Sequence, residues 1–231
     1  MNTTYGEVRF PLDVRYRLEL PEGAAPAGGW PVLLGLHGFG DDADRLAGRL
    51  EGLADAPFAR LYPDGPYPVE LRDAEPKRVG RSWYQYTGDQ DAFLGALAVA
   101  GGHLDRVLES SAGAHPLHLD RVAVLGYSQG GYLAGWYAIT NASRFRGLVA
   151  ISCRIKDEVL GAHLPAARGF PVLVLHGARD EAVKLPPQEE SVARLRDAGV
   201  DVTLEVHDGG HGLKRSLAPR IGAFVEARLR E

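Results

Sequence analysis

Hydrophobic residues recur along the chain in two alternating patterns, short apolar runs and longer stretches with helical spacing. The apolar runs predict strands at Val32–Leu36, Phe58–Tyr62, Val122–Leu125, Gly147–Ile151, Val172–Leu175 and Val202–Val206. The stretches with helical spacing predict helices at Asp91–Leu108, Tyr132–Ala138, Pro187–Ala198 and Leu217–Leu229, and another with Leu46, Leu50 and Leu53 on its inner face. Strands that are apolar throughout are typical of a parallel sheet covered on both faces. The sequence therefore predicts an α/β fold with a mostly parallel central sheet and helices on both faces.

Two segments depart from this alternation. Polar and apolar residues alternate in Glu7–Phe10 and Val14–Leu20, on either side of Pro11, which predicts two antiparallel strands at a sheet edge. The residues from Tyr67 to Gln90 follow neither period, so we expect a long irregular loop there. Loops of this length are uncommon in compact domains unless they serve a function.

The stretch between Ile151 and Val172 is where a cap over the sheet could be inserted. It carries the apolar residues Ile155, Val159, Leu160 and Leu164, and the charged residues Arg154, Lys156, Asp157 and Glu158. This is enough for one short helix, so we expect no large lid. The other wall of any pocket would then come from the Tyr67–Gln90 segment.

Length and composition limit the number of domains and the kinds of partner and metal site that we expect. The 231 residues contain no low-complexity linker or internal repeat, so we expect a single domain over residues 1–231. The formal net charge is -4 and there is no basic cluster, which argues against a nucleic acid or an anionic membrane as partner. A single cysteine, Cys153, excludes an internal disulfide and a cysteine-rich zinc site. The chain is expected to act as a monomer or a homodimer.

Neither a spanning helix nor a leader is predicted. No apolar run approaches the roughly 18 residues that a membrane-spanning helix needs. The first residues, Met1–Glu7, lack a basic region followed by an apolar one, as a signal peptide would have. We therefore expect a cytoplasmic protein that does not contact a membrane.

The stretch from Gly126 to Gly131 has the pattern of a nucleophile elbow. It reads Gly-Tyr-Ser-Gln-Gly-Gly and joins the predicted strand before it to the predicted helix after it. Such a turn forces its central residue, Ser128, into a strained backbone conformation. Small residues are needed two positions away on each side, because strand and helix pass close there, and Gly126 and Gly130 meet this need. Ser128 is therefore the candidate nucleophile, at the positive end of a helix.

A serine hydroxyl needs a base within hydrogen-bond reach, and the base needs a carboxylate to orient it. Asp180 follows the predicted strand that ends at Leu175, and His211 follows the last strand in a glycine-rich loop. The chain order serine, acid, histidine is that of α/β hydrolases. We expect Ser128, Asp180 and His211 to be the catalytic residues.

Other residues could fill these roles. Asp157 and Glu158 follow an earlier strand and are the next candidates for the acid, and Asp180 could instead cap a helix or pair with Arg179. His207 could replace His211 as the base. The spacing of these two histidines is that of a metal-binding pair, but no glutamate follows the first and the segment is rich in glycine. We therefore predict neither a metal site nor a cofactor.

A tetrahedral intermediate needs two donors for its oxyanion. The residue after the nucleophile, Gln129, would supply one backbone N–H. The loop after the Val32–Leu36 strand would supply the other, and our choice there is Phe39, which lies between two glycines. His37 and His176 each precede a glycine at a strand end, and we expect them to bond to backbone near the site, with His37 also a candidate substrate contact. Asp41, Asp42 or Asp44 would cap the following helix.

Together these motifs resemble the phospholipase/carboxylesterase family of α/β hydrolases, which includes bacterial carboxylesterases and acyl-protein thioesterases. The resemblance covers about residues 32 to 227 and rests on the runs Leu36–Asp41, Gly126–Gly131, His176–Asp180 and Gly210–His211. It implies the α/β-hydrolase fold, the same three catalytic residues and the same two oxyanion donors. The run Ser82-Trp83-Tyr84 is similar to one found near the acyl pocket of that family, which makes Trp83 and Tyr84 candidate substrate contacts.

Two features depart from the family. After Asp180 the usual proline-containing run is replaced by Glu181–Lys184. The N-terminal strands and the run Leu61–Gly65 also resemble feruloyl and polyhydroxybutyrate esterases, which leaves the substrate less defined. We expect a serine carboxylesterase that hydrolyses short- to medium-chain carboxylic esters of small molecules through an acyl-enzyme. A thioesterase or lysophospholipase is an alternative, as is a silent α/β hydrolase used as a ligand-binding module.

Overall fold

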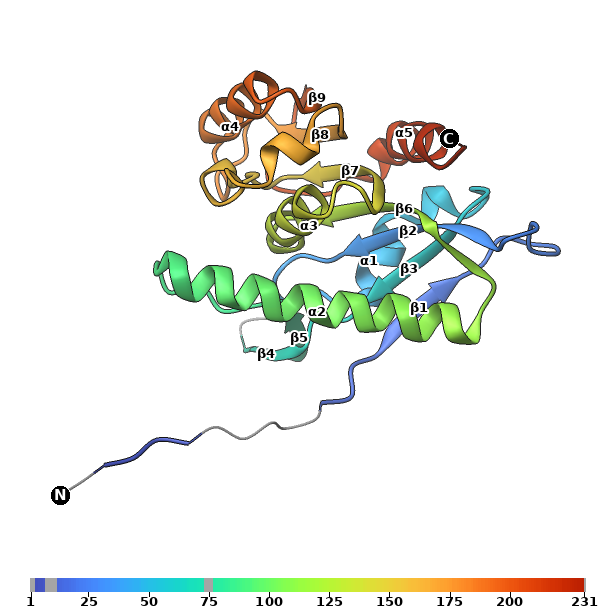
Figure 1. The fold of residues 1–231 in the computed structure, drawn as a ribbon, viewed down its shortest axis with the longest axis horizontal. Helices are drawn as coiled ribbons and strands as arrows, with labels where there is room; N and C mark the ends of the chain where they lie inside the picture. Colours follow the sequence, from blue (N-terminus) through green and yellow to red (C-terminus); the bar gives the residue numbers. More distant parts are fainter. Residues whose placement is uncertain (1–2, 7–11, 73–76, 231) are drawn as a thin grey trace.

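The centre of the protein is a parallel sheet with one antiparallel edge strand. Among residues 3–6, 12–72 and 77–230, which the computed structural model describes, seven strands form this sheet in the order β1-β3-β2-β6-β7-β8-β9 (Figure 1). Their bounds are β1 Tyr16–Glu19, β2 Trp30–Leu36, β3 Ala59–Pro63, β6 Leu117–Tyr127, β7 Phe145–Ile151, β8 Pro171–Gly177 and β9 Asp201–His207. Only the β1–β3 pair of this sheet is antiparallel; the other neighbouring pairs are parallel. The predicted mostly parallel sheet is confirmed.

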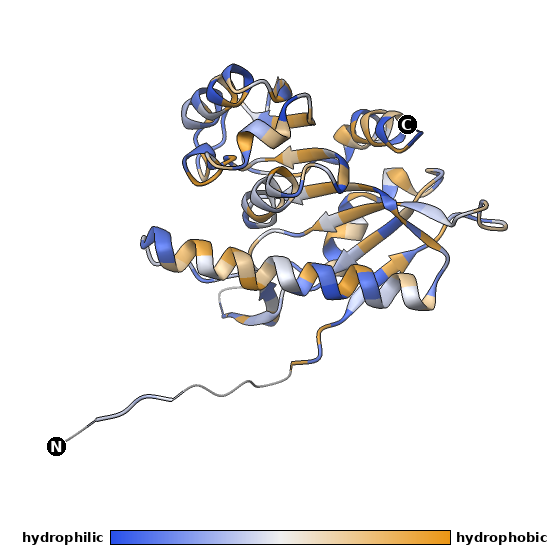
Figure 2. Ribbon diagram, in the orientation of Figure 1, coloured by the Kyte–Doolittle hydropathy of each residue, from blue (hydrophilic) through white to orange (hydrophobic). Residues whose placement is uncertain are grey.

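Helices cover both faces of the sheet, as the apolar strands require. The bounds are α1 Ala43–Arg49, α2 Gln90–Ala114, α3 Gln129–Thr140, α4 Leu185–Asp197 and α5 Ala218–Arg230, with short 3₁₀ turns η1 Glu51–Leu53, η2 Asp157–Val159, η3 Leu164–Ala167 and η4 Arg215–Leu217. The buried residues of α2, α3 and α4 pack in one core, and those of α1 and α5 pack in a second core across the sheet. Figure 2 shows the apolar residues concentrated on the strands between these layers.

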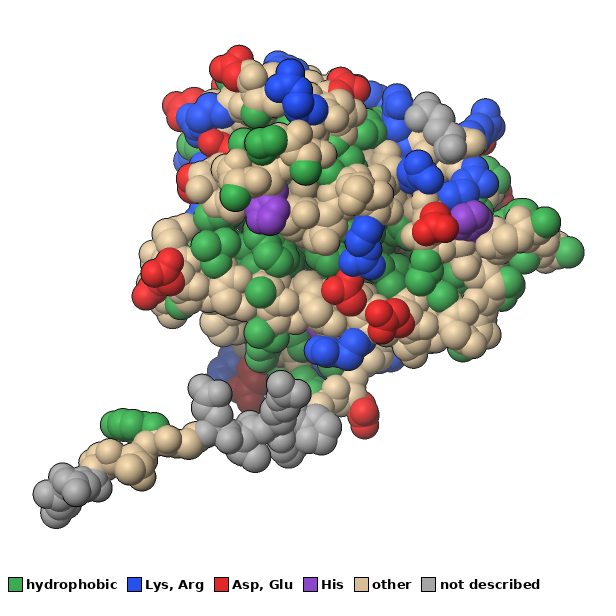
Figure 3. All heavy atoms as spheres, viewed as in Figure 1, with side chains coloured by type: hydrophobic (Ala, Val, Ile, Leu, Met, Phe, Trp, Pro, Cys, Tyr) green, Lys and Arg blue, Asp and Glu red, His purple; other side chains and the backbone are tan. Residues whose placement is uncertain are grey.

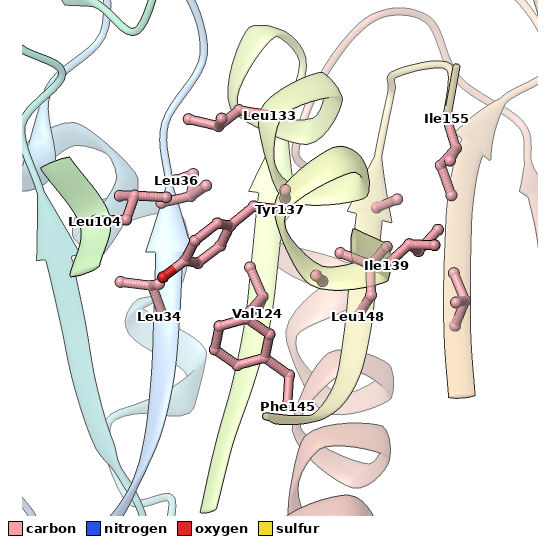
Figure 4. Packing of buried hydrophobic residues seen from close by; sticks show 14 of the residues in the cluster. Leu34, Leu36, Leu104, Val124, Leu133, Tyr137, Ile139, Phe145, Leu148 and Ile155 are labelled. Atoms are coloured by element: carbon pink, nitrogen blue, oxygen red, sulfur yellow. The ribbon is translucent and has the colours of Figure 1, made fainter. Parts of the chain in front are cut away.

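The core under α2 and α3 is built around a buried tyrosine. Tyr137 of α3 lies among aliphatic side chains of β2, β6 and α2, next to the ring of Phe145 at a centroid distance of 5.1 Å (Figure 4). Its hydroxyl donates to Asp105 Oδ1 at 2.6 Å, so the polar end of the side chain is satisfied at the rim. Aromatic residues with this arrangement contribute a large buried area and keep a polar partner. The packing fixes α3, and with it the turn that precedes α3.

Most predicted elements are found with bounds that differ by a few residues, and the helix expected to carry Leu46, Leu50 and Leu53 is split into α1 and η1. One segment differs in kind. The residues expected to form a long irregular loop contain two strands, β4 Tyr67–Leu71 and β5 Arg78–Ser82, which pair antiparallel in a sheet of their own. Apolar residues alternate with Pro68 and Glu70 in β4, but the two strands are short and their only buried residues are Gly80 and Ser82, so they show no apolar run of the kind found in the central sheet. The strand predicted at Glu7–Phe10 lies outside the described residues. The strand predicted over Val14–Leu20 is β1.

The β4–β5 hairpin holds the loop that follows β2. The N–H of Gly40 donates to Arg81 O at 2.9 Å, and the N–H of Arg81 donates to Asp41 O at 2.8 Å. A side chain on Gly80 would lie 2.1 Å from Gly40 O, so the two backbones touch. The N-cap of α1 is Asp42, whose side chain accepts the N–H of Arg45 at 2.9 Å. The paired strands therefore support the β2 loop through backbone contacts.

The chain between β7 and β8 forms two short 3₁₀ turns, η2 and η3, in agreement with the expectation of no large lid. On the face drawn in Figure 3, Lys and Arg side chains lie interspersed with Asp and Glu. Within the described ranges, no helix combines the length and the apolar character needed to cross a lipid bilayer.

The turn between β6 and α3 requires glycine on both sides of Ser128. A side chain on Gly126 would lie 2.3 Å from Gly130 O, and one on Gly130 would lie 2.4 Å from Leu36 O. Both contacts are with backbone atoms, which cannot move aside cheaply. The predicted close approach of strand and helix is confirmed, and it also involves β2.

The loop after β2 is fixed by His37, which is fully buried. Its Nε2 accepts the N–H of Gly65 at 2.9 Å, and its Nδ1–H donates to Gly38 O at 2.7 Å. These partners define the neutral tautomer with the proton on Nδ1. Burial lowers the pKa of His37 from its ordinary value of 6.5, because desolvation outweighs the bond to Gly38 and nearby carboxylates.

The glycine requirement gives a first prediction. Gly130→Ala should lower the free energy of unfolding by about 2 kcal/mol or more, because overpacking against fixed backbone costs about 1–3 kcal/mol. Gly95→Ala is the matched control, since a side chain on Gly95 in α2 would meet nothing within 4 Å. This control should be stabilised by about 0.5–1 kcal/mol. Urea unfolding measures both, and an equal effect in the two variants would contradict the close approach.

The buried His37 gives a second prediction. Because the pKa of His37 is lowered in the folded chain, the unfolded chain takes up a proton on this residue at a higher pH than the folded chain does. The free energy of unfolding should therefore decrease as the pH is lowered through about 6.5. Replacing the imidazole in His37→Gln should reduce this slope by up to about 1.4 kcal/mol per pH unit. Urea unfolding of wild type and variant at several values between about pH 7.5 and 5.5 tests it. Parallel pH profiles would show that His37 does not titrate with unfolding.

Candidate active site

Ser128 occupies the strained position of the turn between β6 and α3. Its φ is 53° and its ψ is -119°, a region that residues with side chains rarely adopt. The turn is held by the N–H of Ser128, which donates to Ile151 O at 2.9 Å. The predicted conformation of the elbow is confirmed. It projects the hydroxyl away from the sheet at the first turn of α3.

Three side chains from separate loops form a hydrogen-bonded chain. Ser128 Oγ lies 2.9 Å from His211 Nε2, and His211 Nδ1 lies 2.9 Å from Asp180 Oδ2 and 3.1 Å from Asp180 Oδ1. The carboxylate can only accept, so Nδ1 carries the proton and Nε2 is free to accept from the serine hydroxyl. The arrangement can remove a proton from Ser128 and hold it on the imidazole.

The carboxylate of Asp180 is buried and firmly held. Its Oδ1 accepts the N–H groups of Ala182 at 3.0 Å and of Val183 at 2.8 Å. Burial by itself would raise the pKa of Asp180, but the N–H of Val183 and the neighbouring His211 outweigh it and hold the pKa below its ordinary value. His176 lies against the same carboxylate, with Nε2 3.6 Å from Asp180 Oδ2, and donates to Val183 O at 2.8 Å.

The structure does not bring the alternative residues together. Asp157 pairs with Arg194, at 2.5 Å between Nε and Oδ2, and Glu158 pairs with Arg154. Neither is bonded to a histidine within the described ranges. The two ring nitrogens of His207 have no hydrogen-bond partner there either. Of the candidates, His211 reaches Ser128 directly and Asp180 is linked to it through His211.

Two backbone N–H groups are available beside the serine. In the described part of the chain, neither the Phe39 N–H nor the Gln129 N–H donates to a backbone carbonyl. The side chain of Gln129 fastens the hairpin to the turn: its Oε1 accepts the Trp83 N–H at 3.1 Å, and its Nε2 donates to Tyr84 O at 3.0 Å. Sequence reasoning assigned Gln129 a backbone role and missed this one.

A cavity of about 440 Å³ opens beside Ser128. It is lined by Phe39, Tyr84, Tyr86, Phe93, Ser128, Gln129, Tyr132, Arg154 and Lys156. Burial raises the pKa of Tyr84 and raises that of Tyr132 to about 12, so both phenols stay neutral. The cavity is therefore mostly aromatic, with two cations in its wall.

Two predicted substrate contacts, Trp83 and His37, lie outside the lining of this cavity. Trp83 is fully buried, its indole N–H donates to His37 O at 2.7 Å, and its ring lies 4.7 Å from the His37 ring. Neither Trp83 nor His37 lines the cavity, because both point under the β2 loop, whereas Tyr84 does line it. No periodic pattern in the sequence distinguishes a tryptophan buried under the loop from one that lines the pocket.

The structure adds five cavity residues that sequence reasoning missed as contacts, namely Tyr86, Phe93, Tyr132, Arg154 and Lys156. Tyr86 could have been predicted from the sequence, since it follows the aromatic run that contains Trp83. Phe93 lies on the apolar stripe of α2 and looks like an ordinary core residue. No group of three His, Cys, Asp or Glu side chains that could hold a metal is found among the described residues.

Comparison with known proteins agrees with this geometry. The chain is 27% identical to poly(3-hydroxyoctanoate) depolymerase of Pseudomonas fluorescens over 219 residues, which are 84% of this chain and 72% of that enzyme. Its fold is similar to that of esterase PE8, with a TM-score of 0.76, 23% identity and coverage of 94% of this chain and 99% of the other. It is also similar to acyl-protein thioesterase 2 of Zea mays, with a TM-score of 0.70, 17% identity and coverage of 93% and 99%.

The family model of phospholipases and carboxylesterases matches residues 30–227, close to the span expected from the motifs. This match covers most of the chain and includes every residue of the hydrogen-bonded chain at Ser128. Together with the mostly parallel sheet, it identifies the chain as an ester hydrolase of the carboxylesterase and thioesterase type. The chain belongs to the phospholipase/carboxylesterase family of α/β hydrolases.

Proposed function

We propose that the protein is a serine esterase that hydrolyses short- to medium-chain carboxylic esters through an acyl-enzyme on Ser128. The observation that carries the proposal is the continuous hydrogen-bonded chain from Ser128 through His211 to the buried Asp180. A serine in this setting can be deprotonated as it attacks, which an isolated hydroxyl at neutral pH cannot.

In the first half of the reaction, Ser128 Oγ attacks the ester carbonyl and its proton passes to His211 Nε2. Asp180 keeps the imidazole oriented and stabilises the imidazolium that forms. His211 then gives the proton to the leaving alcohol. In the second half, a water takes the place of the alcohol, and His211 removes a proton from it as it attacks the acyl group. The acid leaves and Ser128 regains its proton.

The oxyanion that forms in both halves would be bound by the backbone N–H groups of Phe39 and Gln129. Donors of this kind stabilise charge that appears only in the transition state. The support is their lack of backbone acceptors in the described chain and the position of Gln129 at the positive end of α3. The hairpin and His37 would keep the Phe39 loop in place, because both are bonded to that loop.

The aromatic cavity is the proposed acyl site. The leaving alcohol must take its proton from His211, which does not line the cavity, whereas Ser128 and Gln129 do. The acyl group therefore occupies the cavity and the alcohol lies on the other side of the ester. A volume of about 440 Å³ suits a short or medium acyl chain. The relative named poly(3-hydroxyoctanoate) depolymerase takes its name from a polyester of an eight-carbon acid, and an acyl group of that length fits a cavity of this size.

The three side chains give a third prediction. Ser128→Ala should keep the fold and lose essentially all hydrolysis. His211→Ala should match it within about tenfold, because these residues act as a unit. Asp180→Asn should lose about 10⁴-fold in kcat. Hydrolysis of p-nitrophenyl butyrate measures the rates, and mass spectrometry after treatment with a fluorophosphonate should find one adduct, on Ser128.

The matched control for the base is His207→Ala, which should have a mild effect. An essential His207 together with a dispensable His211 would reverse the assignment. Labelling of another serine would refute the assignment of Ser128 as the nucleophile. No labelling of a folded protein would instead support a silent binding module.

The cavity gives a fourth prediction, on chain length. Each methylene adds about 0.8 kcal/mol only while it can be buried, so kcat/KM on p-nitrophenyl esters should rise to roughly four to eight carbons and then fall. Phe93→Ala should weaken the longer of these esters more than acetate, because Phe93 lines the cavity. Val99→Ala, an exposed position on the same helix, is the control. A clear preference for chains of about sixteen carbons would move the assignment toward a lipase or lysophospholipase.

A further inference from the structure

The cavity beside Ser128 has charges of one sign in its wall. Arg154 and Lys156, which lie between β7 and η2, are its charged lining residues in the described chain, and no carboxylate lines it. An ordinary acyl chain needs no cation, so these two side chains are not explained by hydrolysis of simple esters.

Lys156 is the better placed of the two to bind a ligand. Its side chain is only 12% exposed, and Nζ lies 4.7 Å from the centre of the Phe93 ring and 5.0 Å from that of Tyr86. Cations over aromatic rings are stabilised there, and the rings fix where the charge sits. The ammonium is therefore held against two of the aromatic walls of the acyl site.

The hydrogen-bonding capacity of Lys156 is incompletely used. Nζ donates to Gln90 Oε1 at 2.9 Å, and the carboxylate of Glu158 lies 3.9 Å away, beyond hydrogen-bond distance. An ammonium has three donors, so two find no acceptor among the described residues. A mostly buried charge with free donors is stabilised by an incoming anion.

The neighbouring acidic side chains are engaged by arginines. Glu158 is bonded to Arg154, whose Nη1 also donates to Ser191 Oγ at 3.3 Å. Asp157 is bonded to Arg194 through two contacts. Arg154 is thus largely compensated, whereas the charge of Lys156 faces the cavity.

We infer that Lys156 binds a carboxylate at the far end of the acyl group, so that the preferred substrates are half-esters of medium-chain dicarboxylic acids. The inference rests on the proposed function, because it assigns the acyl group to this cavity. The methylenes of such an acyl group pack on Phe93 and Tyr86, and its distal carboxylate accepts from the free donors of Lys156. Lys156 is here a specificity-determining residue and takes no part in bond making.

The test compares two esters that differ in one charge. The mono-p-nitrophenyl ester of adipic or suberic acid is assayed beside the same ester with its free carboxyl capped as a methyl ester. Wild type should favour the charged ester by about tenfold or more in kcat/KM, the discrimination expected of one charge-assisted hydrogen bond. This ratio should fall by a similar factor in Lys156→Gln and be largely retained in Lys156→Arg.

The control variant is Lys77→Gln, which removes an exposed lysine outside the cavity and should leave the ratio unchanged. A second measurement needs no variant. Adipate should inhibit hydrolysis of p-nitrophenyl butyrate at least about tenfold more strongly than hexanoate, although hexanoate is the more apolar of the two.

The outcomes separate the two proposals. A wild-type ratio near or below one, with the capped ester hydrolysed, overturns the inference and leaves the esterase standing. A ratio that survives in folded Lys156→Gln, or equal inhibition by adipate and hexanoate, also overturns it. Failure of wild type to hydrolyse either ester overturns the proposed esterase, and the inference with it.

Discussion

The close contact between the β6–α3 turn and the end of β2 is the constraint on which the site depends. Gly130 sits against Leu36 O at a distance that leaves no room for a side chain, and Gly126 sits equally close to Gly130 O. This contact brings the Ser128 turn and the β2 loop to one place at the carboxyl edge of the sheet. It forces Ser128 into a strained conformation, which the packing of α3 around Tyr137 maintains.

A second set of contacts ties the two loops together from outside the sheet. The β4–β5 hairpin bonds to Gly40 and Asp41 of the β2 loop, while the Gln129 side chain bonds to Trp83 and Tyr84. The two backbone N–H groups that would bind the oxyanion are thus fixed relative to each other by bonds that do not involve substrate. Preorganised donors need no rearrangement as charge develops, which is the condition for strong transition-state stabilisation.

The sequence predicted most of the fold and the three hydrogen-bonded side chains, for identifiable reasons. Central parallel strands are apolar on both faces, so their continuous apolar runs are easily recognised in the sequence. A Gly-x-Ser-x-Gly motif between a strand and a helix has few purely structural uses. The hairpin was missed because, in the described chain, its short strands pair with each other rather than with the central sheet, and their only buried residues are Gly80 and Ser82. Trp83 was misplaced because an aromatic residue next to a site can point into the pocket or under it.

By itself, the sequence determined the succession of strands and helices along the chain and indicated the residues proposed to carry the chemistry, namely the serine between glycines and an acid and a histidine after later strands. These are local properties, which can be recognised from the spacing and type of the residues. Only the tertiary structure decided which carboxylate reaches His211, which aromatic rings line the cavity, and that Lys156 faces it with donors to spare. The physical reason is that contacts between residues far apart in the chain depend on how helices and loops pack over the sheet. This packing cannot be predicted from the hydrophobic period of any single segment.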